Sequence, residues 1–446
     1  MIRPLLFCLL VGSSFSTFAQ DSPPSESVAL TLEQAVAIAQ ANNRSVKNAQ
    51  LVASIDKDQI AEARTYRFPS LSVYALAAEL LTPVNFTFQQ GVFGNYPGIG
   101  PVPSTNTQIH TPLRPSFYGM AQFSQPLSQQ YKIGLNIKQA ELTRLVDEQK
   151  LRAQKQSVSN QVKQTYFAVL KTQSELASSE ENLEFDRELD RTTEQYVIEK
   201  TALKSESMDV KAKIAQEEYN NLMLRDSLAS QKEQLNDLLG RDIRTEFTVV
   251  ELSETAFVET SLDAAQAQAL SARPELSEAR LTVQQAELNR RITKTQYIPD
   301  VSLTVNNLSL TSVNLLPSNV AAAGVLVTWD PLDWGRRKHE LAAASKTIEQ
   351  SRNSANEAEA QILVEVAAKF RKLGETRARL HAIVLQRDAE REKLRVVMNQ
   401  FEQKTALLKD VLQQKMSVGS VADQYNQALL AFLTAKADFE KSVGEE

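Results

Sequence analysis

The feature that most limits how this chain can fold is a run of helix-forming residues from Pro331 to Phe401. Gly374 is its only glycine past the first turn, and no proline follows Pro331. A helix of about 70 residues would reach roughly 105 Å, several times the diameter of a small domain. The side chains that form its heptad seam alternate spacings of three and four: Leu363, Val366, Phe370, Leu373, Arg377, Leu380, Val384, Arg387, Arg391, Leu394, Met398 and Phe401. The run therefore predicts a rod that packs along other rods.

The strongest pattern in the sequence is an internal duplication. Leu32–Ala35 with Pro69 recurs as Leu262–Ala265 with Pro299, and the spacing of 37 residues is the same in both copies (69 − 32 and 299 − 262). Each stretch is predicted to form one helix, and the first would begin with a capping box at Thr31.

A pair of strands with alternating apolar and polar residues is predicted after each of these helices. The strands span about 70–80 and 116–125 in the first half and about 300–310 and 321–330 in the second. Strands of about 9 to 11 residues with one apolar face fit a transmembrane β-barrel, although a soluble two-sheet sandwich would show the same alternation. Aromatic residues at the strand ends lie where an interfacial girdle is expected, although scattered core aromatics would be equally ordinary: Phe123, Trp329 and Trp334.

A matched Pro-Leu pair, at 126–127 and 331–332, is expected to begin each long helix, since proline is favoured in the first helical turn. The first long helix is expected over about 127–196. Shorter returning helices follow over about 208–239 and 410–443. The order is helix, β-hairpin, long helix and returning helix, twice over. The predicted domains are a first repeat at 20–240, a connector at 241–260 and a second repeat at 261–446.

The first 19 residues have the pattern of a secretory signal peptide, with Arg3, an apolar run to Val11 and a small-residue site at Ala19. Cys8 is the only cysteine and lies within this segment. We therefore expect a mature chain without cysteine, disulfide or thiolate metal site.

The composition argues against an enzyme and against a nucleic-acid partner. The formal net charge is −5, and the basic clusters are short and diluted by acidic residues. The histidines are only three, His110, His339 and His381, and they are scattered. No catalytic triad, phosphate-binding glycine loop or metal-ligand spacing accompanies them. No catalytic, metal-binding or cofactor-binding residue is predicted.

Four strands cannot close a barrel, and an open sheet in hydrocarbon leaves the backbone groups at its edges unpaired. Twelve strands from three protomers would close one and leave room for a pore. The predicted fold is therefore mainly α with a transmembrane β-barrel: a trimeric 12-stranded barrel continued by an α-helical barrel. The alternative is a periplasmic coiled-coil adaptor or structural protein without a pore.

The order and duplication of these motifs resemble the TolC-like outer-membrane efflux proteins of Gram-negative bacteria, over essentially the whole mature chain. The markers are Leu32-x-x-Ala35 and Leu262-x-x-Ala265, Tyr66-x-x-Pro69 and the shortened Tyr297-x-Pro299, Ser124–Leu127, the junction Trp329–Arg337 and the closing helix Tyr425–Gly444. The resemblance implies a homotrimer embedded in outer membrane lipid with a periplasmic extension. It also implies that the chain is the exit duct of a tripartite efflux or secretion system, conducting substrates passively. Its partners would be a periplasmic adaptor (membrane-fusion) protein and an inner-membrane pump of the RND, ABC or MFS type.

The resemblance also places a channel gate at the tip between the second long helix and its returning helix. Asp410 keeps the family's position nine residues after the aromatic Phe401. Three such carboxylates around a threefold axis would form a cation-attracting ring. The sequence departs from the family at three positions: Phe401 lacks a hydroxyl, Ala406 replaces an arginine and Gln413 replaces a second acid. We expect a more weakly latched entrance.

Adaptor docking is expected at both helix tips, which share a four-residue sequence: Lys200, Thr201, Ala202 and Leu203 in the first, and Lys404, Thr405, Ala406 and Leu407 in the second. The family's tip glycine falls on Glu199 or Lys200 and on Lys404. In the first repeat the counterpart of Asp410 is expected at Asp209, with about one helical turn inserted. The loop 81–115 is rich in glycine, proline and aromatic residues, and we interpret it either as a cap over the outer mouth or as a disordered insert.

Overall fold

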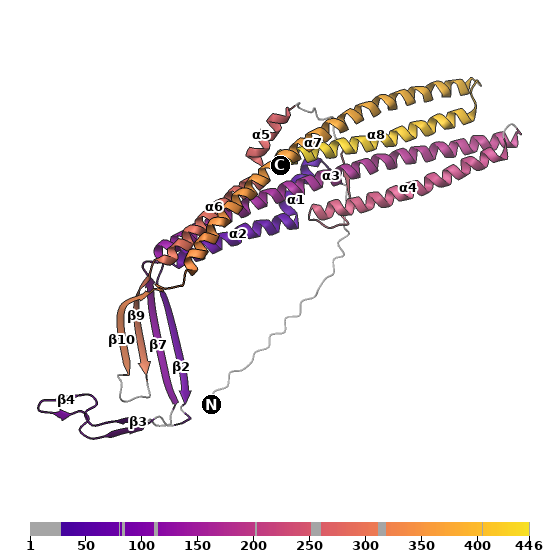
Figure 1. Ribbon diagram of the computed structural model, residues 1–446. Helices are drawn as coiled ribbons and strands as arrows, with labels where there is room; N and C mark the ends of the chain where they lie inside the picture. The colour runs from indigo at the N-terminus through magenta and orange to yellow at the C-terminus, as the bar shows by residue number, and fades with distance from the viewer. Residues whose placement is uncertain are drawn as a thin grey trace, which may run out of the picture. The chain divides into compact units, whose positions relative to one another are not determined.

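The structure, a computed structural model, describes residues 28–79, 81–82, 85–110, 115–200, 203–250, 260–310, 318–403 and 405–445. The expected signal peptide and residues 251–259 of the expected connector lie outside them. The chain divides into two compact units, one made of 1–39, 161–257 and 390–430 and the other of 40–160, 258–389 and 431–446 (Figure 1). Three long helices, α3 (Gln130–Ile198), α7 (Arg336–Glu402) and α8 (Leu408–Ser442), each contribute residues to both units.

The second unit contains one antiparallel four-stranded sheet in the order β10-β9-β7-β2. Its strands are β2 (Ser70–Glu79), β7 (Pro115–Pro126), β9 (Asp300–Leu310) and β10 (Asn319–Thr328), and each begins and ends within two residues of the range expected from the sequence. The two hairpins are joined through β7 and β9, where Phe123 pairs with Val305. Strands β2 and β10 are therefore the edges of this sheet.

The register of the sheet separates two kinds of surface. Leu71, Phe123, Val305 and Ala323 are paired across all four strands, so they share one face. That face is mostly apolar, apart from Gln125 near one end and Glu79, Asn307, Ser309 and Asn319 near the other: Leu71, Val73, Ala75, Ala77, Phe117, Ala121, Phe123, Val301, Leu303, Val305, Ala321, Ala323, Val325 and Val327. The opposite face carries polar side chains in the half nearest the helices: Ser72, Gln122, Ser124, Ser302, Thr304 and Asn306.

Each stretch expected to be one helix before the strands is in fact two helices. In the first repeat α1 (Leu32–Asn42) and α2 (Arg44–Thr65) are separated at Asn43, whose side chain accepts hydrogen bonds from the backbone N–H groups of Ser45 and Val46. This is an N-cap, which starts a new helix rather than continuing the old one.

The second repeat is interrupted at the matching place. Here α5 (Leu262–Ala272) and α6 (Pro274–Lys294) are separated at Arg273, and Pro274 occupies the first turn of the new helix. Proline has no N–H to give to the preceding helix, so the break follows from its position. A short 3-10 turn, η1 (Thr295–Tyr297), leads on towards β9.

The Pro-Leu pairs do not begin the long helices, contrary to the sequence prediction. Pro126 is the last residue of β7, and α3 starts at Gln130. Pro331 precedes a turn, and α7 starts at Arg336. The first junction is instead held to the second repeat: Leu127 N–H donates to Val301 O, and the Ser128 hydroxyl donates to Pro299 O (2.8 Å). Strand hydrogen bonding thus continues past Pro126.

The first unit contains the two helical hairpin ends and a small parallel pair of strands, β1 (Val28–Leu30) and β8 (Phe247–Val249). The hairpins consist of α3 with α4 (Lys204–Leu238), and of α7 with α8. Tyr166 of α3 is fully buried, and its hydroxyl, which can donate to only one acceptor at a time, lies within hydrogen-bond distance of the backbone oxygens of Leu30 (2.9 Å) and Val250 (2.8 Å). A single side chain therefore fixes α3 to the β1–β8 pair.

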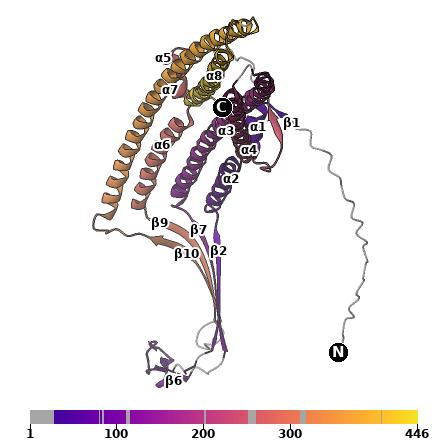
Figure 2. The same cartoon turned by 90° about the vertical axis from the view of Figure 1, so that its right-hand side faces the viewer.

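Residues 85–110 form an ordered lobe at the end of β2 and β7 far from the helices (Figures 1 and 2). It contains two small antiparallel pairs, β3 (Asn85–Phe88) with β6 (Thr107–His110) and β4 (Asn95–Tyr96) with β5 (Gly100–Pro101). For these residues the disordered-insert interpretation is wrong. Among the helices of the described segments, none combines the length and the apolarity needed to cross a membrane.

Candidate functional site

The first helix tip, between α3 and α4, ends in a turn that normally favours glycine. Lys200 has a φ of 59°, in the left-handed region, and its N–H donates to Val197 O (3.1 Å). Glycine adopts this conformation without steric cost. Lys200 thus occupies the type of backbone position at which the family's tip glycine was expected. Thr201 and Ala202 lie outside the described residues.

The second tip, between α7 and α8, places Asp410 in the first turn of α8. Its side chain accepts a hydrogen bond from Leu407 N–H (3.0 Å), and its own N–H donates to Leu407 O (3.0 Å). An acidic side chain here satisfies a free N–H and complements the positive end of the helix. The carboxylate of Asp410 therefore has a structural role as a helix cap, whatever else it contacts.

The first tip repeats this arrangement with Glu206. Leu203 N–H donates to Glu206 Oε2 (3.3 Å), and Glu206 N–H donates to Leu203 O (3.0 Å). The structural counterpart of Asp410 is therefore Glu206, and the expected counterpart, Asp209, is wrong. The shared tip sequences give the same alignment without an inserted turn, since Leu203 and Leu407 each stand three residues before the acid.

The remaining tip residues differ in accessibility. Leu203 and Leu407 are matched and strongly exposed, at 68% and 60%. Thr405 is exposed and its hydroxyl donates to Gln400 O, whereas Ala406 and Phe401 are half-buried. Gln413 is exposed on α8, three residues after Asp410, and Lys404 lies outside the described residues. The channel-gate and adaptor-docking roles of these residues therefore stay predictions.

The aromatic residues expected at the membrane interface are accessible. Trp329 is 53% and Trp334 is 90% exposed, and Phe123 lies on the apolar face of the sheet. Trp334 has a φ of 53° in the turn before α7. Asp333 accepts hydrogen bonds from the N–H groups of Gly335 and Arg337 (both 3.1 Å), and these bonds hold the pKa of its carboxyl below the usual value. This cap sets where α7 begins.

A polar cavity of about 510 Å³ lies between α3, α4 and α8 in the first unit. Its charged lining residues are Glu175, Asp186, Lys213, Glu217, Lys415 and Asp423. The Lys415 ammonium lies 3.1 Å from the centre of the Phe185 ring, and burial lowers its pKa to about 8. Asp186 is almost completely buried and forms an ion pair with Lys213 at 3.3 Å. Sequence reasoning missed this cluster because its members are spread over three helices.

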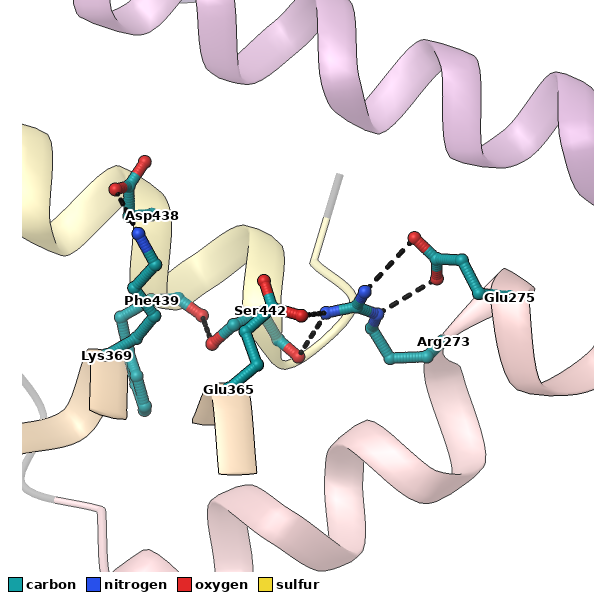
Figure 3. Close-up of polar contacts among 7 residues, drawn as sticks. All are labelled: Arg273, Glu275, Glu365, Lys369, Asp438, Phe439 and Ser442. Atoms are coloured by element: carbon teal, nitrogen blue, oxygen red, sulfur yellow. Dashed lines mark hydrogen bonds and ion pairs between the residues drawn. The ribbon is translucent and has the colours of Figure 1, made fainter. Parts of the chain in front are cut away.

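A second polar cluster, centred on the buried Arg273, joins the end of α5, the start of α6, the middle of α7 and the end of α8 in the second unit (Figure 3). Arg273, between α5 and α6, makes two hydrogen bonds to Glu275, an ion pair with Glu365 of α7 and a hydrogen bond to Ser442 O of α8. Burial alone would lower the pKa of Arg273, but the two carboxylates outweigh it and raise the pKa. Arg273 thus ties the break in the second repeat to the end of the chain.

No group of three or more histidine, cysteine, aspartate or glutamate side chains arranged to hold a metal ion occurs in the described part of the chain. The clusters above are ion pairs and helix caps.

Residues 265–445 match the sequence profile of a family described as outer membrane efflux protein. Comparison with curated proteins gave no significant match. Among solved structures, the chain is similar to the CmeC outer membrane channel of Campylobacter jejuni, with 13% identity, 99% of this chain and 94% of that chain covered, and a TM-score of 0.75. It is also similar to CusC, with 16% identity, 98% and 97% covered and a TM-score of 0.74, and to VceC from Vibrio cholerae, with 15% identity, 93% and 96% covered and a TM-score of 0.72. At these identities the likeness shows a common fold.

Proposed function

We propose, because the chain belongs to the TolC-like outer-membrane efflux protein family, that it is the outer-membrane exit duct of a tripartite efflux or secretion system. Substrates would pass through it from the periplasm to the exterior without chemical change. It lies in the outer membrane and extends into the periplasm.

The four-stranded sheet is the observation that carries this proposal. Its strands of 10 to 12 residues have the length of membrane-spanning β-strands, and its mostly apolar face is left uncovered by any other described element. Water-facing apolar surface of this extent is unfavourable, whereas lipid would cover it at no such cost. The sheet is continuous with helices of 69 and 67 residues, long enough to extend about 100 Å from a membrane.

Closure of the barrel requires more than one protomer. The edges β2 and β10 have free backbone groups on one side, and such groups cannot remain unpaired in hydrocarbon. Three copies joined edge to edge would give the 12-stranded barrel expected from the sequence. The homotrimer is therefore part of the proposal.

The helix tips are proposed to contact a periplasmic adaptor protein, which links the duct to an inner-membrane pump of the RND, ABC or MFS type. The exposed, matched leucines Leu203 and Leu407 support a docking surface there, because each is an apolar side chain in a solvated turn. Three copies of Asp410 would form the cation-attracting entrance, with Ala406 and Gln413 leaving it weakly latched.

Planar-bilayer recording on the purified mature protein tests both the duct and its entrance. Because Asp410 also caps α8, the informative variant is Asp410→Asn, which removes the charge but keeps a hydrogen-bond acceptor. Glu206→Gln makes the same change at the other tip and is the matched control. We expect cation-selective steps from the wild type and from Glu206→Gln, and a loss of selectivity in Asp410→Asn.

Three results would count against parts of this proposal. Inserted trimers that never conduct, even with adaptor present, would contradict the duct. Unchanged selectivity in Asp410→Asn would leave the duct in place and remove Asp410 from its entrance. Conductance that stays very low until an adaptor is added would contradict the weak latch.

A further inference from the structure

The lobe formed by residues 85–110, here called the outer lobe, is a preorganised surface rather than a flexible loop. Beyond its two strand pairs, Gly91 N–H donates to Pro103 O (3.0 Å) and Phe93 N–H donates to Val102 O (2.9 Å). The side chain of Asn106 accepts a hydrogen bond from Gln90 N–H (2.8 Å). These hydrogen bonds join residues of the lobe to one another and hold its backbone in shape.

Large apolar side chains are exposed on the outer lobe. Ile99 is 76% exposed, and three others within the same eight residues are more than half exposed: Val92, Phe93 and Tyr96. Folding of the lobe has left these side chains in water although its backbone is hydrogen bonded. An ordered surface with this pattern is typical of an interface whose partner is missing.

The outer lobe is also almost free of charge. No aspartate, glutamate, lysine or arginine occurs between Glu79 and Arg114, although 23% of the whole chain is charged. Segments that lie on a lipid surface usually carry lysine or arginine to bind headgroup phosphates, and this one has none. A charged protein partner would likewise find nothing complementary here.

Identical copies around a symmetry axis place a surface close to its own equivalent. Any charge near the axis would then meet the same charge in the other copies, which is repulsive. A surface that is apolar and uncharged avoids this conflict and buries area from every copy. The composition of the outer lobe therefore favours contact with further copies of this chain.

We propose that the outer lobes of the three protomers pack against one another through the segment 92–99 and close the outer mouth of the duct with an apolar plug. This inference rests on the proposed function, since it requires the trimeric barrel. The exposed patch is then covered by a second copy of the same chain. The apolar contacts between copies at the outer mouth hold the channel shut until the lobes are separated.

A single-cysteine variant tests the contact directly, because the mature chain is expected to contain no cysteine. In Ile99→Cys trimers we expect oxidation to join protomers covalently, and we expect the cross-linked channel to lose most of its conductance and to regain it on reduction. Thr105→Cys, at an exposed polar position of the same lobe, is the matched control and should cross-link several-fold less.

A second variant examines the plug without any cross-link. Ile99→Asp places three like charges together, so we expect a several-fold larger open fraction in bilayer recordings than for Thr105→Asp. The inference is overturned if Ile99→Cys trimers form but do not cross-link above the Thr105→Cys control, or if a fluorescent label on the introduced thiol of Ile99→Cys is quenched by spin-labelled lipid. Failure of the wild type to form trimers or conduct would instead contradict the proposed function.

Discussion

At the residue scale, Gly444 is held in a tightly restricted position near the end of the chain. Its φ is 88°, and a Cβ atom built on it would lie 2.8 Å from Ala272 Cβ and 3.0 Å from the Ala272 carbonyl carbon. The Gly444 carbonyl also accepts a hydrogen bond from the side chain of Gln156 (2.9 Å). Glycine is needed here both for its backbone conformation and for the close approach of α5.

Gly444→Ala is therefore expected to lower the free energy of unfolding by about 1–3 kcal/mol, through overpacking and backbone strain. Thermal unfolding followed by circular dichroism measures the change. Gly374→Ala is the control, because Gly374 lies inside α7 with no atom within 4 Å of a built Cβ. That variant should be stabilised by about 0.5–1 kcal/mol, and equal behaviour of the two variants would disprove the argument.

Lys415 predicts a dependence of stability on pH. Below about pH 8 the ammonium is protonated in both the folded and the unfolded state. Between about 8 and the ordinary value of 10.5, the unfolded state binds more protons, so the stability of the wild type rises with pH. Burial is the main cause of the lowered pKa; Asp186 and Glu217 attract the charge and Lys213 repels it, but burial outweighs them.

Lys415→Met removes this titration and keeps a side chain of similar length. We expect the variant to be more stable than the wild type at pH 7 and the difference to shrink towards pH 10, as measured by melting temperature. A difference between the two proteins that does not change with pH would show that Lys415 keeps its ordinary pKa.

At the element scale, the Arg273 cluster joins α5, α6, α7 and α8 at one place in the second unit (Figure 3). Arg273→Ala should lower the free energy of unfolding by about 1–3 kcal/mol, because it leaves Ser442 O without this donor and the nearby carboxylates without a partner. Arg273→Lys keeps the charge but not the paired hydrogen bonds to Glu275, and should recover part of the loss. Melting temperatures of the three proteins test this order.

The two faces of the sheet make opposite predictions for the same substitution. Val325 lies on the mostly apolar face, paired with Leu303, whereas the neighbouring strand residue Ala322 lies on the opposite face, paired with Asn306. Val325→Lys should reduce folded protein in outer-membrane fractions, since a lysine on a lipid face costs about 2–4 kcal/mol near the bilayer centre. Ala322→Lys should be tolerated. If Ala322→Lys is harmful and Val325→Lys is tolerated, then the face that carries Ala322 contacts lipid and the face that carries Val325 lines the lumen.

At the scale of the whole molecule, the free edges β2 and β10 predict the oligomer. The native mass in detergent should be three times that of the mature chain, with no stable folded monomer in membranes. Native mass spectrometry of the purified protein measures it. A monomer or dimer that remains inserted would contradict edge-to-edge closure.

Patterns that repeat locally were readable from the sequence. The four strands, the long helices and their returning helices follow from periodicity, because alternation and heptad spacing are properties of neighbouring residues. The breaks at Asn43 and Arg273 were missed although each has a local signal, a capping asparagine and a following proline. The start of α3 was misplaced because hydrogen bonding to the second repeat extends the strand geometry beyond Pro126.

The sequence by itself determined the duplicated order of elements, the alternation of the strands and the absence of charge in the outer lobe, since these depend only on residue type and spacing. The tertiary structure alone decided that Lys415 lies in a polar cavity and that Arg273 meets the end of α8. Both arrangements depend on contacts between segments that are distant in the chain, and local periodicity does not encode such contacts.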